Sequence, residues 1–207
     1  MVTLAAKDLS LNEVHHLLNL QRRDGQPFSD LLSLEPVTET EQQDLRQIRD
    51  DFGDYLNVGR VLEGQIQFLV VAPLLRLAGF YRLPIYISLE QGIAPIEILD
   101  EDTKITGRMD LLAARQDNLT RLWVLVLETK NSASEALNGL PQLLTYAFTS
   151  LEQQQSVWGL TTNGLSYRFV YLQAGDPATY HIMPELNLID DDRALQLLQI
   201  LKAVRMV

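Results

Sequence analysis

The stretch RLWVLVLETKN, residues 121–131, decides the fold because it is a continuous apolar strand that ends in charged residues. A strand that is apolar on both sides is typical of the centre of a sheet with helices on both faces. Two earlier stretches, YRLPIYISLE (81–90) and KITGRMDLLAAR (104–115), alternate apolar and polar residues. We therefore predict three successive strands, the third of them in the interior of a sheet.

Further helices and strands flank these three strands. VLEGQIQFLVVAPLLRLA (61–78) is an apolar helix that is interrupted by Pro73. Residues 132–155 predict a loop and then a helix, because their leucines recur at helical spacing. SVWGLTTNG and LSYRFVYLQ follow as a hairpin around Asn163-Gly164. This order of helix, three strands, helix and strand (αβββαβ) predicts an α/β domain with a mixed sheet flanked by helices.

The two ends of the chain also carry helical patterns. Residues 9–20 and 38–57 have apolar residues at helical intervals, and each stretch follows a residue suited to cap a helix. Residues 191–204 predict a closing helix that leading aspartates stabilise. We expect residues 1–58 to be a helical extension packed on the core, and residues 59–207 to be the main domain.

Composition narrows the class of protein. The chain has 207 residues, 46% of them hydrophobic, which is enough for one sizeable core. It has no cysteine, which excludes disulfides, thiolate zinc sites and cysteine nucleophiles. Its start lacks the apolar run of a secretory signal, and its longest apolar stretches fall short of a membrane span of about 20 residues. We therefore expect a cytoplasmic protein with no membrane contact.

The charge of the chain limits how it can bind nucleic acid. Its formal net charge is −10, and residues 1–60 hold 11 acids against 6 bases. Non-specific affinity for nucleic acid comes mostly from Lys and Arg that release condensed counterions. Any nucleic-acid binding by this chain must therefore be local.

Three charged residues on neighbouring strands predict a reaction site. Glu128 and Lys130 are two apart on one strand, so they leave the same face about 6–7 Å apart. Asp110 lies 18 positions earlier, a spacing at which a strand, turn and strand bring the two acids side by side. Two adjacent carboxylates repel each other, and a hard divalent cation such as Mg²⁺ relieves this. Such a site suits phosphodiester hydrolysis, although Glu128 and Lys130 would also serve simply to pair and solubilise a strand end.

The order of four segments resembles the nuclease module of the PD-(D/E)XK superfamily. The likeness is to the N-terminal domain of type I restriction enzyme R subunits and to related stand-alone proteins. It implies a restriction-endonuclease-like fold and makes residues 59–207 a nuclease-like domain. The matching segments are VLEGQIQFLVVAPLLRLAGF (61–80), ITGRMDLL (105–112), VLVLETKN (124–131) and GLPQLLTYA (139–147).

The resemblance also implies roles for individual residues. Asp110 and Glu128 would bind a Mg²⁺ or Mn²⁺ ion together with the backbone carbonyl of Thr129, and Lys130 is the motif lysine. Three further residues match positions around this site: Glu63 as an acid on the first helix that assists the metal, Gln142 as a catalytic residue and Tyr146 facing the substrate. A helix-starting acid stabilised by the helix dipole remains the alternative for Glu63. A pair that merely extends from the core remains the alternative for Gln142 and Tyr146.

The implied activity is metal-dependent DNA cleavage, with a partner protein that supplies target recognition or as a homodimer. Met109 replaces the proline of the motif, which has a backbone role and no chemical one. The chain has no G-x-x-x-x-G-K-[ST] loop and no room for a motor domain. It is therefore not a complete type I restriction subunit. A catalytically inactive module that binds nucleic acid or a partner is the alternative function.

Overall fold

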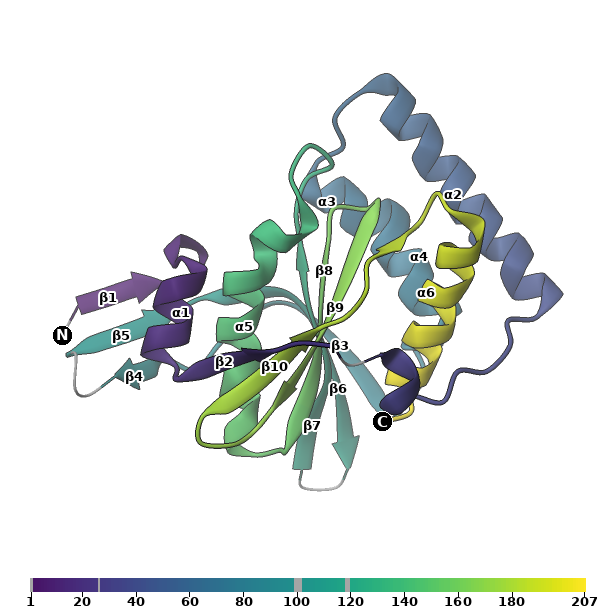
Figure 1. The fold of residues 1–207 in the computed structure, drawn as a ribbon. Coiled ribbons are helices and arrows are strands. Elements are labelled where there is room, and N and C mark those ends of the chain that lie inside the picture. The colour runs from purple at the N-terminus through teal and green to yellow at the C-terminus, as the bar shows by residue number, and fades with distance from the viewer. Residues whose placement is uncertain (1, 26, 99–101, 118–119) are drawn as a thin grey trace.

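The computed structural model describes residues 2–25, 27–98, 102–117 and 120–207. This described part has a mixed α/β architecture with one large and one small sheet, so the expected α/β class is confirmed (Figure 1). The strands of the large sheet follow the order β2-β10-β9-β8-β7-β6-β3, with β11 beside β9. They are β2 (Leu20–Arg23), β3 (Ile85–Gly92), β6 (Arg108–Asp117), β7 (Thr120–Thr129), β8 (Ser156–Thr162), β9 (Ser166–Gln173), β10 (Ala178–Ile182) and β11 (Leu186–Asn187).

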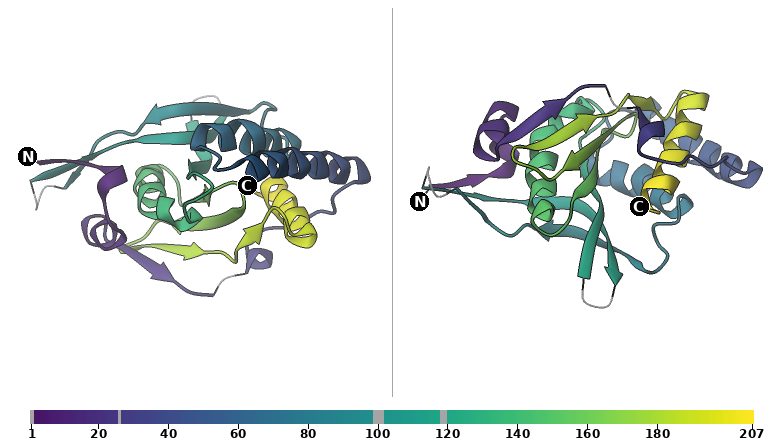
Figure 2. Two further views of the ribbon diagram at one scale, coloured as in Figure 1. Left: turned by 90° about the horizontal axis from the view of Figure 1, so that it is seen from above. Right: turned by 60° about the horizontal axis from the view of Figure 1, so that its bottom comes forward.

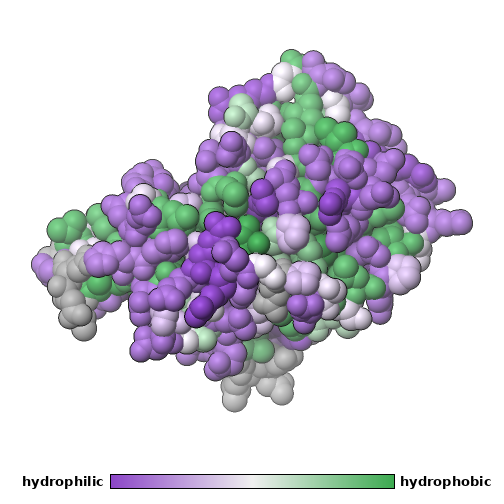
Figure 3. Space-filling model, viewed as in Figure 1, coloured by the Kyte–Doolittle hydropathy of each residue, from purple (hydrophilic) through white to green (hydrophobic). Residues whose placement is uncertain are grey.

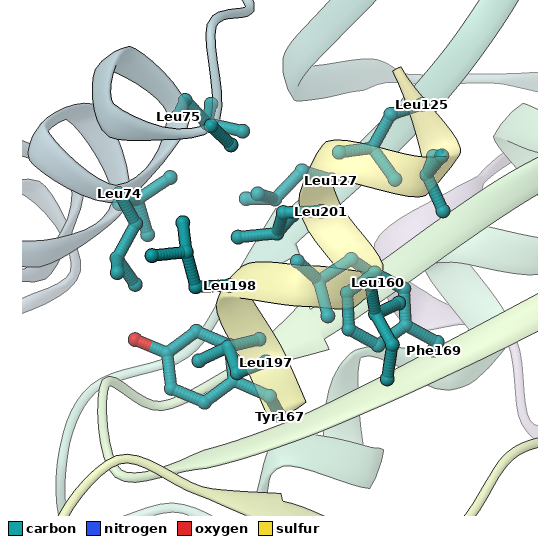
Figure 4. Packing of buried hydrophobic residues seen from close by; sticks show 14 of the residues in the cluster. Leu74, Leu75, Leu125, Leu127, Leu160, Tyr167, Phe169, Leu197, Leu198 and Leu201 are labelled. Atoms are coloured by element: carbon teal, nitrogen blue, oxygen red, sulfur yellow. The ribbon is translucent and has the colours of Figure 1, made fainter. Parts of the chain in front are cut away.

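Helices cover both faces of the large sheet, as an interior strand apolar on both sides requires. The sheet curves around α5, which has α1 beside it, and the other α-helices pack on the opposite face (Figure 2). Figure 4 shows the hydrophobic core on that opposite face, where leucines of α4 and α6 pack against leucines and aromatic residues of β7, β8 and β9. The α-helices are α1 (Leu11–Leu17), α2 (Glu39–Val58), α3 (Glu63–Ile66), α4 (Ala72–Leu77), α5 (Leu140–Phe148) and α6 (Asp191–Val204).

The central strands have the predicted arrangement. β7 pairs antiparallel with β6 and parallel with β8, and β3 pairs antiparallel with β6. The parallel pair needs a crossover connection, and α5 supplies it. The predicted hairpin of β8 and β9 is confirmed, and its turn contains Gly164 with a φ of 88°, a conformation that favours glycine.

The apolar helix predicted over residues 61–78 is present but is not broken at its proline. It runs through α3, a π-helical turn η3 (Gln67–Val71) and α4, and Pro73 lies in the first turn of α4. A π turn is a common way for a helix to absorb an irregularity in its hydrogen bonding. Proline removes one backbone donor, and the wider turn just before Pro73 accommodates that loss.

The N-terminal residues are less helical than predicted. The helix expected over residues 9–20 ends at Leu17, and β2 follows it and pairs parallel with β10. A further strand, β1 (Val2–Ala5), pairs parallel with β5 (Thr103–Thr106). Both strands depend on partners more than 90 residues away, so pairing in the folded chain overrides the local helical pattern.

The stretch predicted as one strand over residues 104–115 is divided. Its first part is β5, which pairs with β4 (Ile96–Ile98) and β1 in the small sheet, and its second part is β6. Gly107 separates the two parts. A Cβ atom at Gly107 would lie 2.5 Å from Cε1 of Tyr146, so only glycine lets this strand pass so close to α5.

Within the described residues, no helix combines the length and apolar character of a membrane-crossing segment. Most of the face in Figure 3 is hydrophilic, with hydrophobic surface at the top over the connection between α2 and α3. Val58 and Leu62 are exposed in that connection, and Phe68 is exposed on the following helix.

Candidate active site

The predicted charged residues meet at one end of β6 and β7. Leu111 pairs with Leu127, which places Asp110 of β6 beside Glu128 of β7. Oδ2 of Asp110 accepts a hydrogen bond from the backbone N–H of Thr129 at 2.7 Å. The structure therefore brings the two predicted acids together, and a backbone hydrogen bond fixes their relative position.

Glu128 is a buried carboxyl group, with only 2% of the residue exposed. Its Oε1 accepts a hydrogen bond from Nζ of Lys130 at 2.8 Å. Its Oε2 is buried and has no hydrogen-bond partner among the described residues. A buried carboxylate oxygen without a partner is costly, so such an atom points to a ligand that completes it.

Both acids hold their protons more tightly than free carboxyl groups do. Burial raises the pKa of Glu128 to about 8, and the neighbouring charge of Asp110 adds to this effect while Lys130 opposes it. Burial also raises the pKa of Asp110, against the hydrogen bond from Thr129. Perturbed carboxyl groups of this kind are typical of functional sites.

A hydrogen-bonded chain runs from Glu128 to helix α5. Nζ of Lys130 donates to Oε1 of Gln142 at 3.1 Å, and Nε2 of Gln142 donates to the hydroxyl of Tyr146 at 2.9 Å. Gln142 and Tyr146 are four apart on α5 and share one face of it. This chain makes Gln142 and Tyr146 partners of the charged site, which a pair extending from the core would not be.

The backbone of the connection before α5 lies in close contact with the side chain of Glu128. The 3₁₀ turn η5 (Ala136–Gly139) ends at Gly139, where a Cβ atom would lie 2.9 Å from Cγ of Glu128. The same Cβ would lie 3.4 Å from Cε of Lys130. Glycine at this position thus lets the backbone close over the carboxyl group and exclude water.

Glu63 stands apart from the other two acids. It is the first residue of α3, is exposed, and raises the pKa of both Asp110 and Glu128 through its charge. Among the described residues, however, no group of three or more His, Cys, Asp or Glu side chains is placed to hold a metal ion. Glu63 as a metal ligand therefore stays a prediction. Its helix, α3, packs on the face of the sheet opposite α5, and its charge acts on both acids.

Thr129 is placed to contribute its carbonyl group. In an extended strand the N–H and C=O of one residue point to the same side. The N–H of Thr129 donates to Asp110, so we expect its carbonyl to face the same acid. The N–H of Lys130 points the other way, to the carbonyl of Thr162 on β8 at 2.8 Å.

Sequence patterns alone missed the two close glycines, Gly107 and Gly139. An isolated glycine inside a strand pattern signals a close approach of another group, and Gly107 carried that signal. Gly139 lies two residues before a proline in the first turn of a helix, and nothing in that local pattern indicates a contact with Glu128. Only the packing of η5 over the end of β7 reveals it.

A comparison of the chain with models of protein families matches none of them, and a comparison with curated proteins finds no match either. The function must therefore be argued from the geometry and chemistry of the site itself.

Proposed function

We propose that this chain is a metal-dependent endodeoxyribonuclease that hydrolyses DNA phosphodiester bonds. The observation that carries the proposal is the buried, unpartnered Oε2 of Glu128, beside Asp110 and ion-paired through its other oxygen to Lys130. A site that only solubilised a strand end would be exposed, whereas this one is enclosed. Two acids and a lysine in an enclosed site suit phosphoryl chemistry.

The topology supports a restriction-endonuclease-like fold. A helix precedes β3, β6 and β7. β6 pairs antiparallel with both β3 and β7, and α5 leads to β8, which pairs parallel with β7. This is the αβββαβ order that the resemblance implies. The small sheet and β2 are additions at the margins of that core, and neither interrupts the strands that carry the acids.

The residues fit a Mg²⁺ or Mn²⁺ ion. Asp110, Glu128 and the carbonyl of Thr129 would hold it, because hard divalent cations prefer oxygen ligands and Oε2 of Glu128 has no partner among the described residues. The ion would lower the pKa of an attacking water and neutralise charge on the phosphate. The mutual repulsion that raises the pKa of Glu128 is then relieved by binding.

Lys130 acts on the substrate side of this arrangement. Its ammonium group has three donors, and Glu128 and Gln142 accept two of the hydrogen bonds. No described residue accepts from the third donor in these hydrogen bonds, so it would bind a phosphate oxygen or orient a water molecule. Tyr146 holds the amide of Gln142, and the amide in turn holds the ammonium group in place.

Partners and location follow from the charge and composition. With a net charge of −10 the chain binds DNA weakly on its own, so we propose a homodimer or a partner protein that supplies target recognition. The absence of cysteine fits a cytoplasmic setting.

A cleavage assay with purified protein tests the proposal. Plasmid DNA, linear duplex and RNA are incubated with Mg²⁺, with Mn²⁺ and with EDTA. We expect DNA cleavage that requires the metal and is lost in Asp110→Ala and Lys130→Ala. The matched control is Asp192→Ala, which removes an exposed acid at the start of α6. If the wild type and the site variants cut equally, the activity is a contaminant and the proposal is wrong.

A second candidate function is a non-catalytic module that keeps this scaffold for assembly. The observation that favours it is the hydrophobic surface beside Glu63, where Val58 is 91% and Leu62 is 57% exposed. Exposed apolar patches often mark interaction surfaces. Calorimetry with Mn²⁺ separates the two candidates: heat of binding that disappears in Asp110→Ala supports the nuclease, and no heat in the wild type supports the module.

A further inference from the structure

An exposed ion pair stands next to the acids of the site. Nε of Arg108 lies 2.7 Å from Oε2 of Glu90, and the two side chains are 66% and 56% exposed. Arg108 is two residues before Asp110 on β6, which places their Cα atoms about 6–7 Å apart. The backbone of Arg108 hydrogen-bonds the hydroxyl of Tyr146, so the base of this side chain is fixed to the site. Its guanidinium group remains at the surface.

Glu90 has an unusual backbone conformation. Its φ is 52°, in the left-handed region that non-glycine residues rarely occupy. It falls opposite Asp110, between the paired residues Leu89–Leu111 and Gln91–Met109. Such strain persists only where surrounding structure enforces it, and it concentrates at functional sites. An exposed ion pair offsets little of that cost, so the pair with Arg108 does not by itself explain the conformation.

The acids of the site would repel the phosphates of DNA, so a bound DNA strand needs a further cation close to them. Among the groups that act on the charge of Glu128 in the described residues, Asp110 and Glu63 are acids and Lys130 is a cation, in a chain whose net charge is −10. A DNA backbone that approaches these acids is repelled unless another cation meets it. Arginine suits this task because its planar fork matches phosphate oxygens.

We propose that Arg108 binds a phosphate of the DNA flanking the one that is cleaved, and that Glu90 is a counter-ion which this phosphate displaces. In the free protein Glu90 holds the guanidinium group and masks its charge. In the complex the phosphate takes the place of Glu90, and Arg108 positions the strand over Asp110 and Glu128. Arg108 is thus a substrate-positioning residue. This inference rests on the proposed nuclease function.

The two residues should act in opposite directions, which a general loss of structure cannot imitate. We measure binding of a fluorescently labelled duplex by anisotropy, in EDTA so that no metal-dependent cleavage occurs, over a range of salt concentrations. Arg108→Gln should weaken binding about 5-fold to 10-fold and lower the salt slope by about 1. Glu90→Gln should tighten binding about 2-fold to 5-fold by freeing Arg108. The double variant should behave as Arg108→Gln.

Matched controls come from another exposed ion pair, on a distant strand. Arg22 and Asp24, with side chains 55% and 89% exposed, lie at the end of β2, and four strands separate β2 from β6 in the sheet order. Arg22→Gln and Asp24→Asn should leave the salt slope unchanged. Arg108→Lys keeps the charge and should restore the slope, which a purely structural role for Arg108 would not produce.

Failure of this inference can be told from failure of the nuclease proposal. If wild-type protein cleaves DNA while Arg108→Gln binds with an unchanged affinity and salt slope, Arg108 has no such role and the nuclease proposal stands. If Glu90→Gln weakens binding, Glu90 does not mask Arg108 and the inference is overturned. A wild type that neither binds nor cleaves DNA overturns both.

Discussion

Leu127 and Glu128 are neighbours on β7 and both are almost fully buried, yet burial of the first stabilises the fold and burial of the second destabilises it. Leu127 faces α4 and α6 and is enclosed by other apolar residues. Glu128 faces α5 and holds a carboxyl group with one oxygen unpartnered. One face of the strand thus stabilises the fold, and the other contains a group whose burial costs free energy. Under the proposed function, the chemistry takes place on the α5 face.

The largest effect on stability should come from truncating Leu127, the apolar residue of this pair. Leu127→Ala should lower the free energy of unfolding by about 3–4 kcal/mol, because it leaves a cavity in a closely packed core. Urea unfolding measures this change. Leu89→Ala, at a 65% exposed leucine of β3, is the matched control and should change stability by less than about 1 kcal/mol. Similar losses in the two variants would show that the α4 and α6 face is not the stabilising one.

At high pH, Glu128→Gln should raise the stability of the protein, whereas Leu127→Ala should lower it. The pKa of Glu128 is about 8 in the folded chain and near its ordinary value of 4.5 when unfolded, so the folded state keeps the proton between these values and stability falls as pH rises through that window. The titratable groups around it are Asp110, Glu63, Lys130 and Tyr146. Glu128→Gln has no such proton to lose, so it should gain up to a few kcal/mol of stability relative to wild type as pH rises from 5 to 9.

Unfolding in urea at several pH values tests this, without divalent cations. The exposed Glu97 supplies the control, and Glu97→Gln should follow the wild-type pH profile. A Glu128→Gln variant whose stability runs parallel to wild type from pH 5 to pH 9 would show that burial of this carboxyl group has no cost. Activity should be lost in Glu128→Gln at every pH, since the proposed ligand is gone.

The contact that closes the backbone over Glu128 should give a smaller effect. Gly139→Ala places a Cβ atom 2.9 Å from Cγ of Glu128, and the required shift should cost about 1–2 kcal/mol and reduce cleavage at least 10-fold. Thermal unfolding and the cleavage assay measure the two effects. Gly53→Ala on α2 is the control, because nothing lies within 4 Å of its added Cβ. Equal stability and activity in both variants would mean that Glu128 moves aside freely.

The sequence predicts the elements whose signals are local. The apolar run of β7 with Glu128 at its end, the helical spacing around Gln142 and the turn at Gly164 each identify an element without its neighbours. The meeting of Asp110 with Glu128 follows as well, because strand periodicity and one short turn are enough to place them together.

The features that sequence reasoning missed are set by distant partners. β1 and β2 form against strands far along the chain, and the helical pattern of residues 9–20 gives no hint of this. The contact of Gly139 with Glu128 depends on how η5 packs. The exposed position of Glu63 depends on which face of the sheet α3 covers. Such choices belong to tertiary packing, which propensity and period do not determine.

The smallest effect should come from Tyr146, the far end of the hydrogen-bonded chain. Tyr146→Phe removes the hydroxyl that accepts from Gln142 at 2.9 Å, which should cost about 1 kcal/mol of stability. Cleavage should fall only a few-fold, because Gln142 still accepts from Lys130. Tyr55→Phe, at a tyrosine that is 46% exposed, should change neither quantity. In a Lys130→Ala background the effect of Tyr146→Phe on stability should shrink, since the two residues act through one chain. If Tyr146→Phe costs as much stability in the Lys130→Ala background as in wild type, Tyr146 is not coupled to Lys130 and serves only the packing of the core.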